Sequence, residues 1–136
     1  MSGPGFRFEA PAGWKVERAK ARVSASNDAE LVQVATFPLL KAYDATLFDK
    51  VARELRVRMR EIAGQTKGTL SGERTVQAGG VRSHAYDVTV GEQVDEYTFV
   101  LAGKREYLLL CRRPSDDDAS DVCLRLAGSF TRETRD

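Results

Sequence analysis

YLLLC, residues 107–111, is the stretch of sequence that decides the fold, because it is apolar at every position. A β-strand points successive side chains to opposite faces of its sheet, so a strand without a polar face needs cover on both faces. We therefore expect residues 107–111 to form a central strand of a sheet that is covered on each side.

The segments before this strand alternate between apolar and polar residues with a period of two, and turn residues separate them. Strands are predicted at Phe6–Phe8, Trp14–Glu17, Ala21–Ala25, Leu31–Phe37, Leu70–Val76, Ser83–Val90 and Val94–Leu101. Turns are predicted at Gly79-Gly80, Gly91-Glu92 and Gly103-Lys104. Three short turns in succession favour antiparallel order over parallel strands joined by crossover helices.

The hydrophobic period changes to that of a helix between Thr46 and Ala63. One stripe of this helix holds Phe48, Val51, Leu55, Met59 and Ile62. Asp44 or Thr46 can cap its N-terminus, and Gly64 supplies a stop. A second helix is predicted after Ser115 and Asp118, which resemble a capping box. Its inner stripe holds Ala119, Val122, Cys123, Leu126 and Phe130.

These elements predict an α+β fold in which helices flank an antiparallel β-sheet, an α/β/α sandwich. The 136 residues are the usual size of one domain, so residues 1–136 are expected to form a single unit. Residues 1–5 are expected to be a flexible or cloning-derived start.

The composition excludes several classes of protein. Basic and acidic residues number 21 and 20, for a net charge of +1, so a nucleic-acid partner is not expected. No apolar run approaches the roughly 20 residues of a membrane helix. Residues 1–5 have neither the basic nor the apolar region of a signal peptide, which fits a cytosolic protein or a mature domain without its leader. The small residues at the start favour the second alternative.

Cys111 and Cys123 are twelve residues apart, one on the central strand and one on the inner stripe of the second helix. A disulfide between them would tie the helix to the sheet and stabilise the fold by about 3 kcal/mol, provided that the protein is exported to an oxidising compartment. The alternative is a pair of buried thiols. A zinc site is not expected, because C-x₂-C pairs and a histidine cluster are missing.

No residue set forms a catalytic, cofactor or metal signature, so we expect neither enzymatic activity nor a cofactor. His84 is the only histidine, and no nucleophile is paired with it by any motif. Asp116, Asp117, Asp118 and Asp121 lack the spacing of a calcium loop. Acidic residues are expected in the first turn of a helix, where they complement its dipole.

The best candidate for a partner surface is one sector of the predicted helix at 46–63, with Arg53, Arg56, Val57 and Arg60. Mixed charges beside this sector also fit an ordinary solvated face. Val57 favours a partner, because it is an apolar residue on the outward side of the helix.

Phe6-x-Phe8, followed by Pro11-x-Gly13-Trp14, resembles the opening of the PsbP-like (Mog-like) domain family, which has bacterial relatives of the LpqN and DcrB types. The late strand at 107–111 and the ending Ser129-Phe130 are similar to the same relatives. The resemblance implies an antiparallel sheet with helices on both faces. It also implies an assembly, GTPase-binding or lipoprotein role rather than an enzyme, and no functional residue of the family can be placed on this sequence.

Three hypotheses about function follow. The first is a non-enzymatic binding or assembly protein, the soluble domain of an exported or lipid-anchored envelope protein, whose protein partner is unknown. The second is a cytosolic interaction module that binds its partner through the helix face at Arg53, Arg56 and Arg60. The third is a small-molecule binding protein with a pocket between sheet and helix, near His84 and Tyr97.

Overall fold

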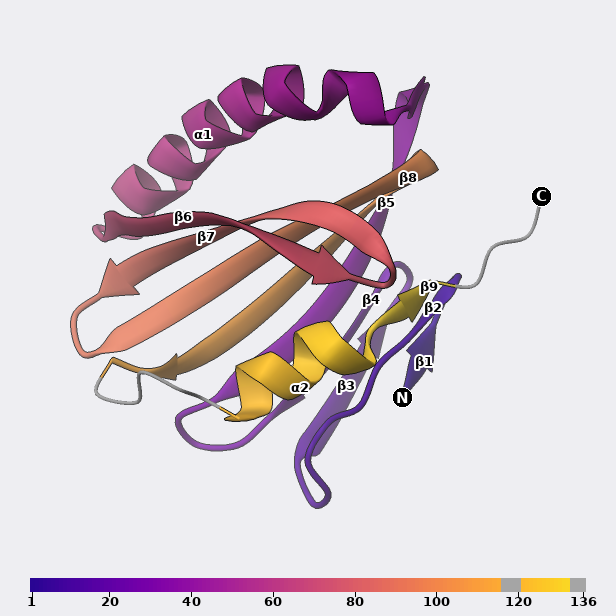
Figure 1. Ribbon diagram of the computed structural model, residues 1–136. Coiled ribbons are helices and arrows are strands. Elements are labelled where there is room, and N and C mark those ends of the chain that lie inside the picture. The colour runs from indigo at the N-terminus through magenta and orange to yellow at the C-terminus, as the bar shows by residue number, and fades with distance from the viewer. Residues whose placement is uncertain (116–120, 133–136) are drawn as a thin grey trace.

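The computed structural model describes residues 1–115 and 121–132 (Figure 1). Strands and helices follow the order β1 (Ser2–Gly3), β2 (Phe6–Arg7), β3 (Lys15–Ala19), β4 (Arg22–Ser26), β5 (Leu31–Tyr43), a 3₁₀ turn (Ala45–Leu47), α1 (Phe48–Gln65), β6 (Thr69–Ala78), β7 (Val81–Val90), β8 (Gln93–Pro114), α2 (Asp121–Ser129) and β9 (Thr131–Arg132). The main sheet has the order β3-β4-β5-β8-β7-β6, and β1, β2 and β9 form a small second sheet. Every strand pair is antiparallel, as predicted.

The strand β8 folds back on itself at Gly103, which has a φ of 57°. Arg112 Nε lies 2.9 Å from the Asp95 carboxylate, and the Ser115 N–H donates to the Glu92 carbonyl at 2.8 Å. If β8 were straight, the two residues of each of these pairs would lie more than about 50 Å apart. The first arm of β8 (residues 93–102) pairs with β7 and the second arm (residues 104–114) with β5, which confirms the predicted turn at Gly103.

Two apolar clusters lie on opposite faces of the sheet, and the second arm of β8 contributes to both. Leu109 and Cys111 belong to the cluster beneath α2, whereas Leu108 and Leu110 pack against the cluster beneath α1. The prediction that residues 107–111 form a central strand, covered on both faces, is confirmed.

The predicted α/β/α sandwich is wrong. The described residues are mostly strand, 56% against 24% helix, and their two helices are too few to form complete layers. The reason lies in the residues of β4 and β5 on the face that carries α1. There Arg22, Ser24, Ser26 and Gln33 are polar, and Leu31 and Ala35 alone add little apolar surface for a helix to cover.

Each helix therefore covers only part of one face, and the two parts lie diagonally across the sheet (Figure 1). The helix α1 packs on β6 and β7, whereas α2 packs on β8, β6 and β5. Aromatic residues before β3 complete the cover on the α2 side: Phe6, Phe8 and Trp14.

The helix boundaries differ little from the prediction for α1. Asp44 caps the 3₁₀ turn by accepting from the Thr46 N–H at 2.8 Å, and α1 then runs from Phe48 to Gln65. The predicted capping pair of the second helix includes Asp118, which lies outside the described residues, as do Asp116 and Asp117. Ser2 and Gly3, assigned to a flexible start, form β1.

Candidate functional site

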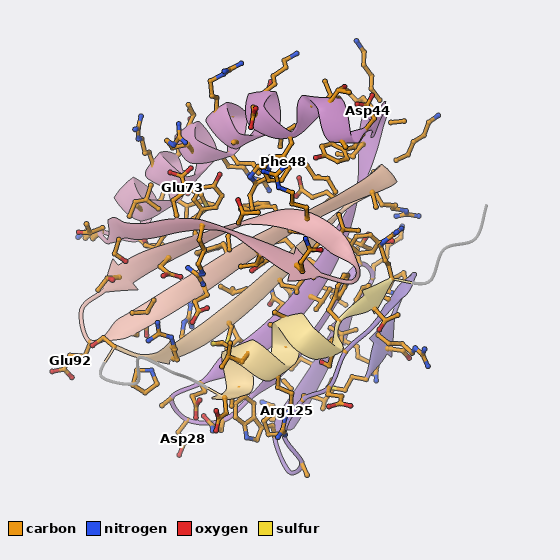
Figure 2. All side chains as sticks on the ribbon, viewed as in Figure 1. Asp28, Asp44, Phe48, Glu73, Glu92 and Arg125 are labelled. Carbon is orange, nitrogen blue, oxygen red and sulfur yellow. A yellow bond between two sulfur atoms is a disulfide. The ribbon has the colours of Figure 1, made fainter. Side chains whose placement is uncertain are left out.

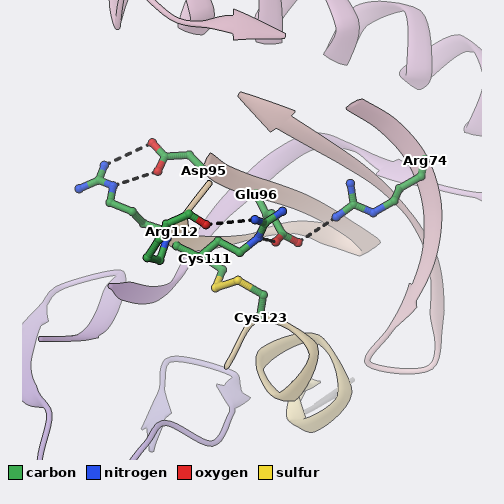
Figure 3. The surroundings of a disulfide bond; sticks show 8 residues. Arg74, Asp95, Glu96, Cys111, Arg112 and Cys123 are labelled. Carbon is green, nitrogen blue, oxygen red and sulfur yellow. Dashed lines mark hydrogen bonds and ion pairs between the residues drawn. A yellow bond between two sulfur atoms is a disulfide. The ribbon is translucent and has the colours of Figure 1, made fainter. Parts of the chain in front are cut away.

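Cys111 and Cys123 are bonded to each other, with their Cα atoms 5.6 Å apart. Cys111 lies on the second arm of β8 and Cys123 in the first turn of α2, and both are buried. The predicted disulfide is confirmed, and it fixes α2 at one distance from the sheet (Figure 3).

A groove of about 440 Å³ lies beside this bond, between α2 and strands β6, β7 and β8. Its α2 wall holds Leu124, Leu126 and Ala127. Leu124 is 67% exposed, so this wall presents an apolar side chain to solvent. The sheet side holds the polar residues Arg74, Asp87, Glu96, Thr98 and Arg113, together with Val76, Leu109 and Cys111.

Ion pairs link the four charged residues of the groove in one chain. Arg74 lies 2.9 Å from Asp87 Oδ2 and 2.9 Å from Glu96 Oε1, and Arg113 Nε lies 2.6 Å from Glu96 Oε2. Figure 3 shows the contact between Glu96 and Arg74. Two cations and two carboxylates leave this network without net charge, and mutual bonding holds each group in place.

The described residues contain no cluster of three or more His, Cys, Asp or Glu that could hold a metal ion. No helix in the described ranges has the length and hydropathy that a membrane span requires. The groove is therefore the best-formed candidate for a binding site, and its chemistry is that of hydrogen bonds, fixed charges and one apolar wall.

The predicted partner surface on α1 is only partly available. Arg53, Val57 and Arg60 are exposed, and Val57 retains 54% of its accessible surface. Arg56 instead reaches β6, where its guanidinium contacts Glu73 at 2.7 and 3.1 Å. This contact makes Arg56 a link between α1 and the sheet.

Sequence reasoning missed Arg58, which also links α1 to the sheet. Its guanidinium lies 3.3 Å from the Glu106 carboxylate and 5.2 Å from the centre of the Phe99 ring. The side chain of Glu106 is only 10% exposed, so Arg58 neutralises a nearly buried charge.

His84 and Tyr97 lie inside the molecule, and neither lines the groove. The His84 ring stacks on Phe48, with ring centres 3.9 Å apart, and Arg82 lies over the same Phe48 ring. Burial, together with the positive charge of Arg82, lowers the pKa of His84. Burial raises the pKa of Tyr97, which belongs to the cluster beneath α1.

The groove itself had no signal in the sequence. Its charged residues come from three strands. In the sequence each of them looks like one of the polar residues that alternate with apolar ones in any half-exposed strand. Only Cys111 and Cys123 pointed to this side of the sheet.

The fold and the groove define a class: a mostly β domain of the α+β type, whose C-terminal helix is tied to the central strand by a disulfide. No family model matches the chain, and no curated protein matches it. Among solved structures, the chain is similar to a crystal structure from Bacteroides thetaiotaomicron, with 11% identity and a TM-score of 0.65. The match covers 96% of this chain and 46% of that one, so this chain spans a little under half of its neighbour's length. At this identity the likeness shows a shared fold alone. The resemblance to PsbP-like domains stays a prediction.

Proposed function

We propose that this chain is a non-enzymatic binding or assembly module of an oxidising, extracytoplasmic compartment, and that the groove beside α2 holds an extended segment of a protein partner. The observation that carries the proposal is the Cys111–Cys123 bond, because it both indicates the compartment and fixes the wall of the groove.

The chemistry of the Cys111–Cys123 bond supports an oxidising compartment. Disulfides persist in secreted and envelope proteins, whereas the reducing cytosol keeps thiols unpaired. The bond lies beneath α2, with Cys111 and Cys123 both under 10% exposed, so reductants reach it poorly. These properties support a structural bond in an exported or lipid-anchored protein.

The two sides of the groove together support a binding role. The apolar wall at Leu124 can bury a partner side chain, and the network of Arg74, Asp87, Glu96 and Arg113 offers both donors and acceptors. A peptide backbone needs both kinds of group. The two cysteines of the lining are bonded to each other, so neither is a free thiolate nucleophile, which favours a binding role for the groove.

Site-specific photo-crosslinking in the native host tests the groove. A photoreactive amino acid at Leu124 is expected to give one discrete protein adduct, and the same group at Val16, an exposed valine of β3, is expected to give none. Arg113→Gln should weaken the Leu124 adduct, because the substitution removes a charge from the groove.

An adduct from Val57 but not from Leu124 would instead favour the alternative, a cytosolic module that binds through the α1 face. The exposure of Val57 between Arg53 and Arg60 is the observation behind this second candidate.

Alkylation of the protein in intact cells tests the compartment. Both cysteines are expected to escape iodoacetamide under denaturing conditions until a reductant is added. Alkylation of both cysteines without a reductant would contradict the exported location. It would not affect the proposed binding role of the groove, which the crosslinking experiment tests separately.

A further inference from the structure

One end of the main sheet carries an irregular projection, which we call the sheet tip: residues 37–43 of β5 and residues 103–105 of β8. Pro38 pairs with Arg105 and Tyr43 pairs with Gly103. The four residues 39–42 therefore stand opposite the single residue Lys104. An excess of this size on one strand must bulge outward, so the tip projects beyond the regular sheet.

The bulge exposes apolar side chains that nothing in the described structure covers. Leu40 is 103% exposed, the highest value among the large exposed apolar residues of the described chain, and Phe37 is 40% exposed. A large apolar side chain exposed to this extent, with a second one three residues before it in the chain, makes the tip a candidate for a binding surface.

The charges around the tip are mostly positive. In the turns and chain segments at this end of the sheet (residues 20–21, 37–50, 79–82 and 103–105), the exposed basic residues are Lys20, Lys41, Lys50, Arg82, Lys104 and Arg105. The exposed acidic residues of the same segments are Asp44 and Asp49. Asp44 already caps the 3₁₀ turn, and Glu106 is held by Arg58.

The opposite end of the strands has a mixed charge. The turns at 27–30 and 91–92 carry Asp28, Glu30 and Glu92, whereas Lys15 and Lys67 lie at the same end. Figure 2 shows Asp28 and Glu92 at the end of the molecule away from Asp44. The basic excess is therefore concentrated at the tip, which would orient the molecule in front of a negative surface.

We infer that the sheet tip docks on an anionic lipid surface. Leu40 and Phe37 enter the interfacial region of the bilayer, and Lys41, Lys104 and Arg105 hold the lipid headgroups. An apolar projection ringed by cations has the composition of interfacial membrane anchors. The tip comprises only residues 37–43 and 103–105, which fits a bilayer better than a protein interface of roughly 800 Å² per partner.

Docking at the tip leaves the groove open. Glu96 lies seven residues from Gly103 along the first arm of β8, a distance of about 23 Å in a strand. A protein held by its tip would thus present the groove and α2 away from the bilayer. The inference does not rest on the proposed function, because it concerns different residues.

Vesicle flotation tests the inference. The probe is vesicles of phosphatidylcholine with 30% phosphatidylglycerol, against pure phosphatidylcholine, at low and at 0.5 M salt. We expect binding to the anionic vesicles only, and loss of binding at high salt.

Two variants separate the apolar and the charged contributions. Leu40→Asp is expected to lower the partition coefficient about tenfold or more, because it removes the most exposed apolar side chain. The triple variant Lys41→Gln/Lys104→Gln/Arg105→Gln is expected to lower it at least as much. Their controls are Val16→Asp and the charge-matched triple Lys15→Gln/Arg60→Gln/Arg125→Gln, both of which should bind as the unchanged protein does.

Several results would overturn the inference. One is the absence of binding to anionic vesicles by the unchanged, folded protein. Another is equal binding by Leu40→Asp, whose urea unfolding should match that of the unchanged protein. A dimer that Leu40→Asp dissociates, without vesicle binding, would assign the tip to a second copy of the chain.

Discussion

Asp87 of β7 and Glu96 of β8 stand directly opposite each other, so one cross-strand pair holds two carboxylates. Like charges in this position repel, and Arg74 offsets the repulsion by bonding to both. The neighbouring strand makes room for this arrangement at Gly72. A Cβ atom at that position would lie 2.7 Å from Asp87 Oδ2, and β6 shifts its register at the same point.

Glu96 should therefore be the most sensitive member of the groove network. Glu96→Ala is expected to lower the free energy of unfolding by about 2–3 kcal/mol, because Arg113, whose side chain is 11% exposed, loses a charged partner. Urea denaturation measures the loss. Glu73→Ala is the control, since its pair with Arg56 is exposed and should contribute little to the free energy of unfolding. Equal losses in both variants would show that the groove network adds nothing specific.

The disulfide should stabilise the whole domain. The bond closes a loop between residues 12 apart, so the double variant Cys111→Ala/Cys123→Ala is expected to lose about 3 kcal/mol. Urea denaturation with and without a reductant measures this loss. The reductant should destabilise the unchanged protein by a similar amount and leave the double variant unaffected. A reductant effect on the double variant would contradict the assignment.

Met59 should carry much of the packing between α1 and the sheet, because its side chain is completely buried. Met59→Ala is expected to lower the free energy of unfolding by about 2–5 kcal/mol. Val57→Ala, two residues along the same helix, should change it by less than about 0.5 kcal/mol, since Val57 is exposed. If the Met59 variant were as stable as the Val57 variant, α1 would not pack as described.

His84 should make stability depend on pH. Burial and Arg82 lower its pKa below the ordinary 6.5, so the unfolded chain takes up a proton before the folded protein does. The contribution of His84 to the free energy of unfolding is therefore fully present above about pH 7, where the side chain is neutral in both states. It is lost as the pH falls below 6.5.

Urea denaturation at several pH values between 5 and 8 checks this prediction, with His84→Gln as the reference. The difference in free energy of unfolding between the unchanged protein and His84→Gln should shrink as the pH falls. A constant difference would mean that His84 titrates alike in both states.

Local patterns predicted the elements of this fold well. The stripe from Phe48 to Ile62 identified α1, and the apolar run at 107–111 identified the central strand, because both patterns lie within one element. The disulfide could be predicted only as one of two alternatives, since the strand at 107–111 is apolar on both faces and its pattern does not show which face Cys111 takes.

The extent of cover and the groove could not be predicted in the same way. Whether a helix covers a strand depends on neighbours such as Arg22 and Gln33, which come together only through strand pairing. The groove joins Arg74, Asp87 and Arg113 from three strands, and single polar alternates give no sign of such a network. The exposure of Leu40 arises from a mismatch in pairing between β5 and β8.

The sharing of residues 107–111 between the two apolar clusters constrains the order in which the protein can be assembled. A ribosome that has translated as far as Gly103 has delivered every buried residue of the cluster beneath α1, but the cluster beneath α2 still lacks Tyr107, Leu109 and Cys111. That second cluster becomes complete only when the second arm of β8 and then α2, with Cys123 and Leu126, have emerged. One face of the sheet therefore stays open until synthesis is nearly finished, the condition in which chaperones bind exposed apolar surface.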